Sequence, residues 1–277
     1  MKTKESALTK AQRLWAVTVA FMRANIIDEI TYPASFVMTE IGVVAPLFIY
    51  YFLGELVGES AQVGGDYFTF AVIGMAVSSV LQSALSGFGN SLQAAQNRGI
   101  FETFLVEPVP WLYLPVAMNL YRIILGVFNG FLLLAVGLIF GVSINPSGLF
   151  PFLLLLGLGV VASVAVGVFA AAVGILAKRA QPLLTLYGMA ASLLGGALFS
   201  VAQLPAFLQV LALAIPHTYV INAARAVLMD DPGSFVMSFG TAMWSLLAFC
   251  AVAVTLSLWM FHRALQYART EGILSGY

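Results

Sequence analysis

The chain has 277 residues, of which 61% are hydrophobic and 9% are charged, and its formal net charge is zero. Soluble domains carry about a quarter charged residues, so a chain with this composition would expose large apolar patches in water. The composition therefore excludes an ordinary soluble domain and predicts an integral membrane protein. The balanced charge also leaves no broad basic surface, and we expect no nucleic-acid partner.

The N-terminal segment 7–31 is predicted to form an amphipathic helix, because apolar Leu14 and Phe21 are mixed with charged Arg13 and Asp28. It is too polar to cross a bilayer, so we expect it to lie along the inner membrane interface, with a solvated tail as the alternative. The segment lacks the continuous apolar run and cleavage site of a secretory signal, and it is expected to remain in the mature protein.

Six apolar stretches follow, and each approaches the roughly 20 residues that a helix needs to cross a bilayer. They cover residues 34–57, 66–89, 112–141, 150–177, 183–201 and 236–262. We therefore predict an all-α membrane protein with six transmembrane helices. Its three parts are a cytoplasmic tail with the interface helix, a six-span transmembrane domain and a cytoplasmic C-terminal tail, at residues 1–33, 34–262 and 263–277.

Lysine and arginine residues are distributed unevenly between the two sides of the predicted spans. An even number of spans places both termini on one side, and that side holds ten of these residues: Lys2, Lys4, Lys10, Arg13, Arg23, Arg98, Lys178, Arg179, Arg263 and Arg269. The opposite loops hold Arg225 alone, and Arg122 lies inside the third span. Because cytoplasmic loops are enriched in lysine and arginine, both termini are predicted to be cytoplasmic.

Glu40 and Arg122 are charged residues that fall within predicted spans. Glu40 lies early in the first span and Arg122 about two turns into the third, both toward the inside. A charge at the centre of a spanning helix costs about 2.5–3.5 kcal/mol on the insertion scale, so such residues usually face protein or water. The two side chains either pair as a structural latch or contact a substrate near the inner mouth.

The loop between the second and third spans contains the sequence RGIFETFLVEP, which predicts a short amphipathic cytoplasmic helix. Three apolar side chains recur at the spacing of one helix face, with charged side chains beside them. The apolar residues are Phe101, Phe104 and Leu105, and the charged residues are Arg98, Glu102 and Glu107. Pro108 and Pro110 end the helix. Such a helix suits docking into a groove on a soluble protein, and the alternative is a helix that lies on lipid headgroups.

Small residues recur four positions apart in the fourth and fifth spans. The two sets are Ser163, Gly167 and Ala171, and Gly188, Ser192 and Gly196. Small residues at this spacing allow the backbones of two helices to approach closely. The partner helix lies either within the chain or in a second subunit.

The outer connection between the fifth and sixth spans is apolar but is interrupted by Pro205 and Pro216. The piece between these prolines has about half the length that a crossing needs. We predict a re-entrant hairpin of two short helices, with an apolar surface loop as the alternative. Tyr219 and Arg225 are expected to brace this hairpin, and a gating role is the alternative.

The sequence contains no arrangement that is typical of catalysis. His217 and His262 are the only histidines, and no Cys, His and carboxylate cluster has the spacing of a metal site. The motifs of a nucleophile elbow and of a phosphate-binding loop are also absent. We expect no enzyme activity, no metal site and no cofactor in the chain itself, so any ATP hydrolysis would take place on another chain.

Three features together resemble the membrane subunit of ABC-2-type transporters, the type V ABC exporters. An amphipathic helix precedes the first span. The segment from Arg98 to Pro108 is similar to the family's cytoplasmic coupling helix, and the sequence PHTYVINAAR from Pro216 to Arg225 is similar to the signature of its outer re-entrant hairpin. The order and spacing of these features against six spans cover nearly the whole chain.

The resemblance implies a division of labour among several subunits in a prokaryotic inner membrane. Two permease copies, identical or paralogous, would form the path above two nucleotide-binding ATPase subunits, which would hold ATP and Mg. The implied ATPase-coupling residues are Arg98, Gly99, Phe101, Glu102, Phe104 and Leu105, and the implied hairpin or gate residues are Pro216, His217, Tyr219 and Arg225. Closure of the ATPase pair would move the coupling helices and favour one arrangement of the spans.

The resemblance also implies export of an amphipathic drug-like, lipid or lipid-linked glycan substrate out of the cytoplasm. One alternative is an ATP-independent secondary transporter, which usually has broken helices and coupling-ion residues at mid-depth. The other is an integral-membrane lipid-modifying enzyme, which would need clustered acids or histidines at an interface.

Overall fold

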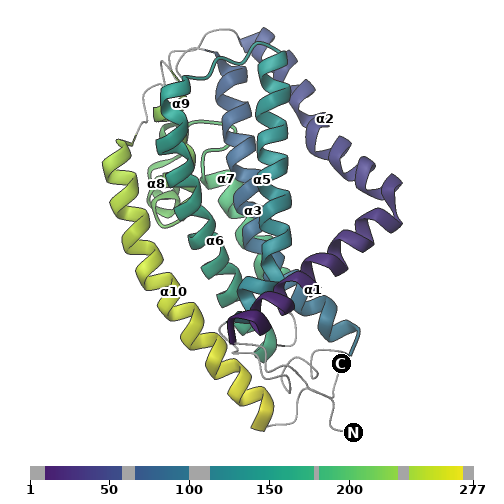
Figure 1. Ribbon diagram of the computed structural model, residues 1–277. Coiled ribbons are helices and arrows are strands. Elements are labelled where there is room, and N and C mark those ends of the chain that lie inside the picture. The colour runs from purple at the N-terminus through teal and green to yellow at the C-terminus, as the bar shows by residue number, and fades with distance from the viewer. Residues whose placement is uncertain (1–9, 58–65, 100–112, 178–180, 230–236, 271–277) are drawn as a thin grey trace, which may run out of the picture.

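A computed structural model of the chain describes residues 10–57, 66–99, 113–177, 181–229 and 237–270, and these ranges form helices joined by turns (Figure 1). The helices are α1 (Lys10–Thr31), α2 (Pro33–Val57), α3 (Tyr67–Asn97), α5 (Leu114–Ile139), α6 (Leu149–Ala177), α7 (Gln181–Leu194), α8 (Ala206–Leu213), α9 (Pro216–Leu228) and α10 (Phe239–Thr270). Two short 3-10 turns lie among them, η2 (Pro146–Gly148) and η3 (Val201–Gln203).

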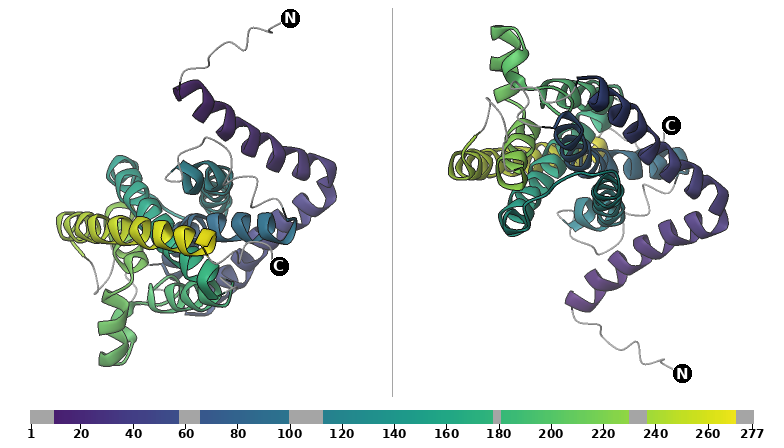
Figure 2. Two further views of the ribbon diagram at one scale, coloured as in Figure 1. Left: turned by 90° about the horizontal axis from the view of Figure 1, so that it is seen from below. Right: turned by 90° about the horizontal axis from the view of Figure 1, so that it is seen from above.

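Helix α3 forms the centre of the bundle, and most of its residues are buried. Helices α5 and α6 pack along it, and α10 packs along α6 on the outer side (Figures 1 and 2). The buried side chains of α3 include Ile73, Leu81 and Leu85. Since lipid tails are as apolar as leucine, close packing rather than exclusion of water holds such helices together.

The contact between α6 and α3 is close because α6 carries a glycine there. A Cβ atom at Gly167 would overlap the main-chain carbonyl of Leu85. Ser163 and Ala171, about one turn to either side, have no exposed surface. The small-residue set predicted in the fourth span therefore has its partner within the chain.

Helices α1 and α2 form an open V at one side of the bundle (Figures 1 and 2). Helix α1 ends at Thr31, and Pro33 occupies the first position of α2, where its missing N–H leaves no hydrogen bond unmade. Most of the surface of α2 is uncovered, and Phe52 and Leu56 are 68% and 83% exposed. Helix α2 therefore presents an apolar face outward.

Within the described residues, five helices are long and apolar enough to cross a membrane, and the bent pair of α8 and α9 would be a sixth if it formed one span. The predicted fifth span, residues 183–201, is the one that differs, because α7 ends at Leu194. A 14-residue helix rises about 21 Å, which is less than the roughly 30 Å hydrocarbon core. The helix ends because Gly195 and Gly196 follow it, and Gly196 has a φ of +77°, which other residues rarely adopt.

Helices α3 and α10 continue beyond the spans predicted from hydropathy. Helix α3 reaches Asn97 instead of ending near residue 89, and α10 reaches Thr270 instead of ending near residue 262. Polar residues interrupt the apolar pattern at these ends, but they do not interrupt a helical backbone. Helix α10 thus extends into the segment that was predicted to be a C-terminal tail.

Candidate functional site

The predicted coupling helix lies largely outside the described residues, and this applies to Phe101, Glu102, Phe104 and Leu105. Arg98 and Gly99 are described, and they end α3. The Arg98 N–H donates to the carbonyl of Ala94 at 3.1 Å, and the Gly99 N–H donates to that of Gln96 at 2.9 Å. Gly99 has a φ of +69°, the left-handed conformation that often closes a helix. Segment 100–112 therefore continues directly from the end of the central helix.

Glu40 of α2 makes its polar contact with α5. When the Asn129 amide is oriented to satisfy its hydrogen bonds, its nitrogen donates to Glu40 Oε2 at 2.8 Å and to the carbonyl of Leu125 at 3.2 Å. Asn129 is buried and Glu40 is partly buried, so this bond lies at the edge of the packed helices. The contact joins α2 to α5 across the opening of the V.

Arg122 lies elsewhere, and no ion pair joins it to Glu40 among the residues that the structure describes. Its side chain instead lines a cavity of about 480 Å³ between α1, α3 and α5. Asp28 and Arg98 line the same cavity. The two charged residues predicted within the spans thus serve different contacts, and a latch formed by their direct pairing is absent from this arrangement.

The segment predicted to form the outer hairpin contains α8 and α9, which meet at an angle of 92°. Two hydroxyl groups in the first turn of α9 reach back to the last turn of α8. Thr218 Oγ1 donates to the carbonyl of Ala212 at 2.6 Å, and the Tyr219 hydroxyl donates to that of Leu213 at 2.7 Å. The last carbonyls of a helix lack partners within it, so these bonds satisfy them and fix the bend. Pro216 occupies the start of α9, where proline is favoured.

Arg225 of α9 is buried and binds main-chain carbonyls of two other elements. Its Nε and Nη2 donate to the carbonyl of Phe70 in α3, at 3.2 and 3.0 Å. Its Nη1 donates to Gly196 and its Nη2 to Ala197, both at 2.6 Å. Gly196 and Ala197 lie in the turn after α7, where helical hydrogen bonding has ended. Arg225 therefore joins α9, α3 and the end of α7.

The backbone around Arg225 is shaped to admit the guanidinium group. The Arg225 Cζ lies 3.3 Å from the centre of the Phe70 ring, a cation–π arrangement. At Gly74, one turn further along α3, a Cβ atom would overlap the Ala197 carbonyl and the guanidinium. A charge is costly to bury unless it is fully hydrogen-bonded, and the carbonyls supply those bonds here.

His217 is buried in the same hairpin, at 1% exposure, and its ring lies beside that of Tyr187 with centroids 6.0 Å apart. Among the described residues, neither ring nitrogen of His217 has a hydrogen-bond partner, and nor does the Tyr187 hydroxyl. Across all the residues that the structure describes, no group of three or more His, Cys, Asp and Glu side chains could hold a metal ion. The contacts of His217 are therefore mainly packing contacts.

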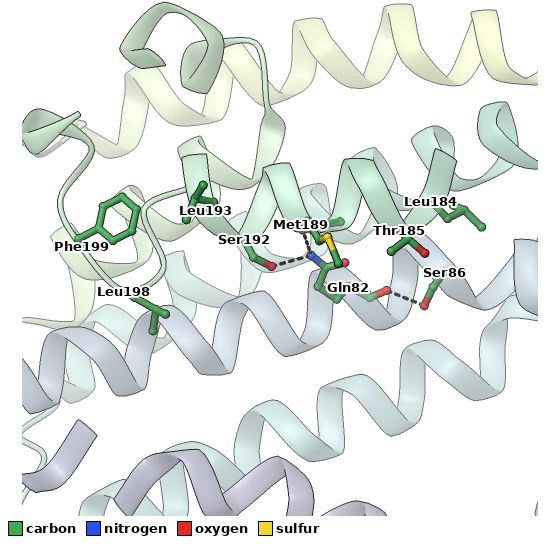
Figure 3. Close-up of a pocket in the computed structure, with 10 residues that line it drawn as sticks. Gln82, Ser86, Leu184, Thr185, Met189, Ser192, Leu193, Leu198 and Phe199 are labelled. Atoms are coloured by element: carbon green, nitrogen blue, oxygen red, sulfur yellow. Dashed lines mark hydrogen bonds between the residues drawn. The ribbon is translucent and has the colours of Figure 1, made fainter. Parts of the chain in front are cut away.

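A groove between α3 and α7 was not predicted from the sequence (Figure 3). It has a volume of about 560 Å³ and mixes hydroxyl and amide groups with apolar walls. Gln82 of α3 lies at its centre and donates to the carbonyl of Gly188 at 2.7 Å and to Ser192 Oγ at 3.0 Å. The lining residues are Gln82, Ser86, Leu184, Thr185, Gly188, Met189, Ser192, Leu193, Leu198 and Phe199. The small residues predicted in the fifth span thus also face a helix of this chain.

A second cavity of about 320 Å³ shares Gln82, Ser192 and Leu198 with the groove and extends it toward α2, where Val43 and Tyr50 line it. The signal for this surface was present in the sequence. Ser78, Gln82 and Ser86 are spaced four apart along α3, and Thr185 and Ser192 are seven apart along α7. These spacings place polar groups on one face of each helix. Because these polar residues are uncharged, hydropathy and charge did not distinguish them from the apolar residues of the predicted spans.

Comparisons with known proteins agree with this architecture. A search of curated proteins finds no match. A sequence model of the ABC-2 type transporter family matches residues 15–229 and so covers more than half of the chain. The matched part runs from α1 through α3 and the groove to the residue after α9. The chain therefore belongs to the ABC-2 type transporter family and is a multi-pass permease component of a membrane transporter.

Proposed function

We propose that this chain is the permease subunit of an ATP-driven exporter in a prokaryotic inner membrane. It acts as a dimer with two ABC ATPase subunits on the cytoplasmic side, and it moves an amphipathic substrate outward. Membership of the ABC-2 type transporter family supports the transport role. The observation that carries the choice of substrate class is the groove between α3 and α7.

The lining of the groove suits a molecule with both polar and apolar parts. Leucine, methionine and phenylalanine side chains form its walls, and Gln82, Ser86, Thr185 and Ser192 offer amide and hydroxyl groups. None of its lining residues is ionisable, so it gives no counter-charge to a small hydrophilic ion. Apolar walls with a few placed polar groups are typical of sites for drug-sized molecules.

Helix α3 connects the groove to both ends of the molecule. Its 31 residues rise about 46 Å, from the Arg225 contact at Phe70, past Gln82, to Arg98 at the other end. In the proposed orientation Arg98 faces the cytoplasm, and the ATPase pair acts on segment 98–108. A displacement there moves a rigid helix that also forms one wall of the groove. This gives nucleotide binding a direct effect on the substrate surface.

The proposal is tested with an ABC ATPase, which would be sought in the reading frames adjacent to the gene for this chain. We expect the two proteins to co-purify and to drive ATP-dependent uptake of a fluorescent amphipathic dye or phospholipid into inverted vesicles. Phe101→Ala together with Glu102→Ala should abolish both, because it removes the apolar and charged groups of the predicted coupling helix. Trp244→Ala with Thr241→Ala is the control, since Trp244 is exposed on α10 far along the chain.

Three results would contradict the proposal. An ATPase complex that survives the Phe101 and Glu102 double substitution would remove the coupling assignment. Uptake that persists without nucleotide would favour the secondary transporter. A dye or lipid that is modified chemically during the assay would point to the enzyme alternative.

A further inference from the structure

The cavity between α1, α3 and α5 is separate from the groove and has a different chemistry. Its volume is about 480 Å³. Apolar side chains of α1 form one wall and those of α3 and α5 form the others, among them Val17, Phe21, Ala94 and Met118. Helix α1 is tied to the bundle beside this cavity, where Thr18 Oγ1 and the Tyr113 hydroxyl are hydrogen-bonded. The cavity therefore lies where an interfacial helix meets two spanning helices.

Three charged side chains, one from each helix, line this cavity. Arg98 comes from the end of α3, Arg122 from α5 and Asp28 from α1. Arg122 lies eight residues after the start of α5, about 12 Å along the helix axis. No ion pair links the three side chains within the described residues, although all three are described. Within the described ranges, the two guanidinium groups at the edge of an apolar layer therefore have no anionic partner.

The charges and the walls together define the occupant. Guanidinium groups match the geometry of phosphate oxygens and bind them with charge-assisted hydrogen bonds. Basic pockets between spanning helices at the cytoplasmic side are typical sites for lipid headgroups. The Asp28 carboxylate adds a place for a cation on the opposite wall, and the apolar side chains suit an acyl chain. A free phosphate ion would leave these apolar walls without a contact.

We propose that this cavity binds one phospholipid of the inner leaflet, with its phosphodiester between Arg98 and Arg122 and an ammonium group beside Asp28. Phosphatidylethanolamine has this charge pattern. The bound lipid fills the angle between α1 and the bundle and holds the interface helix against α3 and α5. The proposal uses the cytoplasmic placement of Arg98 from the proposed function, but it needs neither an ATPase nor transport.

The test uses the full chain, without ATPase or nucleotide, in phosphatidylcholine vesicles that contain a trace of phosphatidylethanolamine with a photoreactive acyl chain. After irradiation, labelled peptides are identified by mass spectrometry. We expect labelling of the α1 and α5 segments around Phe21 and Met118. Arg98→Gln and Arg122→Gln should each lower it about tenfold, since each removes hydrogen bonds to a charged group. Arg23→Gln is the matched control, because Arg23 is an exposed arginine of α1 that does not line the cavity.

Two further arms identify the headgroup. Asp28→Asn should lower labelling by phosphatidylethanolamine but not by phosphatidylglycerol, which has no ammonium group. Inorganic phosphate in excess should not compete. Arg122→Lys, which keeps the positive charge, should retain part of the labelling and shows that the site is still folded.

Equal labelling in Arg122→Gln and Arg23→Gln would overturn the site. Competition by inorganic phosphate would show that the ligand is the free ion and not a lipid. An Asp28→Asn variant that keeps its full preference for phosphatidylethanolamine would overturn the ammonium assignment. These outcomes leave the exporter proposal unaffected, since that proposal fails only on ATPase binding and nucleotide dependence.

Discussion

Arg225 makes four hydrogen bonds, and every acceptor is a main-chain carbonyl oxygen. Carbonyl acceptors do not titrate and do not change rotamer, so they hold the guanidinium in one position. The acceptors belong to α3 and to the turn after α7. A single side chain thereby sets the positions of the hairpin, the central helix and the helix that forms the second wall of the groove.

Replacing Arg225 is expected to destabilise the protein strongly. Arg225→Gln leaves buried carbonyls without their donors, and each buried polar group left unsatisfied costs about 1–3 kcal/mol of unfolding free energy. The measurement is denaturation of the detergent-solubilised protein followed by tryptophan fluorescence. Arg263→Gln is the control, because Arg263 is exposed and lies over Trp259 at 5.7 Å. Similar losses in both variants would contradict the bracing role.

A hydroxyl group in the groove is expected to affect substrate handling without affecting stability. Thr185→Val keeps the shape of an exposed side chain but removes one hydrogen-bonding group from the lining. One neutral hydrogen bond contributes about 0.5–1.5 kcal/mol, so the apparent affinity for a transported amphipathic dye should fall about twofold to tenfold. Thr255→Val on the exposed face of α10 should leave the affinity unchanged. Equal affinities in the two variants would place the substrate elsewhere.

At the scale of elements, packing between α3 and its neighbours depends on very small side chains. Gly167 admits the Leu85 carbonyl, and Gly74 admits the Ala197 carbonyl together with Arg225. Neither glycine has a positive φ, so neither position needs glycine for its backbone conformation. Each needs glycine because a larger residue would not fit. The distance between α3 and α6, and that between α3 and the turn after α7, are therefore set by these two positions.

Enlarging Gly167 is expected to separate α6 from α3. Gly167→Leu places a side chain where the Leu85 carbonyl lies, and overpacking of this kind costs about 1–3 kcal/mol or more. Gly157→Leu is a matched control on the same helix, since no atom lies within 4 Å of the position of its Cβ. Thermal unfolding in detergent should show a lower midpoint for the first variant alone. A normal midpoint for Gly167→Leu would contradict the intrachain packing.

At the scale of the whole molecule, the second cavity continues the groove toward α2, which stands away from the bundle (Figure 1). The second cavity reaches α2 at Val43 and Tyr50, and the outer face of α2 is apolar and exposed. In the proposed dimer, a second copy seated against this face would close the groove from the lipid. The two copies would then share one enclosed path.

The proposed dimer predicts that a disulfide crosslink between two copies of the chain forms through α2. In a Cys250→Ala background, Phe52→Cys on α2 should form a disulfide-linked dimer under mild oxidation. Val252 on α10 is as exposed as Phe52, since both side chains are 68% exposed. Val252→Cys should nevertheless form no disulfide-linked dimer. The readout is the mobility of the membrane-embedded protein on a non-reducing gel. Crosslinking through α10 in place of α2 would contradict this arrangement.

Hydropathy located five of the spanning helices, because those helices carry continuous apolar runs. Hydropathy did not predict the end of α7 within residues 183–201. The sequence stays apolar there, but Gly195 and Gly196 end the helical backbone, and a count of apolar residues does not detect this. The Glu40 contact could not be predicted either. It depends on how α2 lies against α5, and this brings Asn129 to Glu40 instead of Arg122.

Arg225 could be assigned to the hairpin from the sequence, but its acceptors could not. Main-chain carbonyls carry no sequence signal, and Phe70 and Gly196 are distant in the chain. The groove was not predicted for a related reason. The spacing of its uncharged polar residues marks a shared surface only once the neighbouring helix is known.

The acceptors of Arg225 all precede it in the chain, at residues 70, 196 and 197. During synthesis, the arginine is therefore added after all the residues that it binds. A lone arginine within the apolar layer is disfavoured by about 2.5–3.5 kcal/mol, and the earlier helices remove that penalty as α9 arrives. A chain that ended before α9 would leave these three carbonyls without their guanidinium donors.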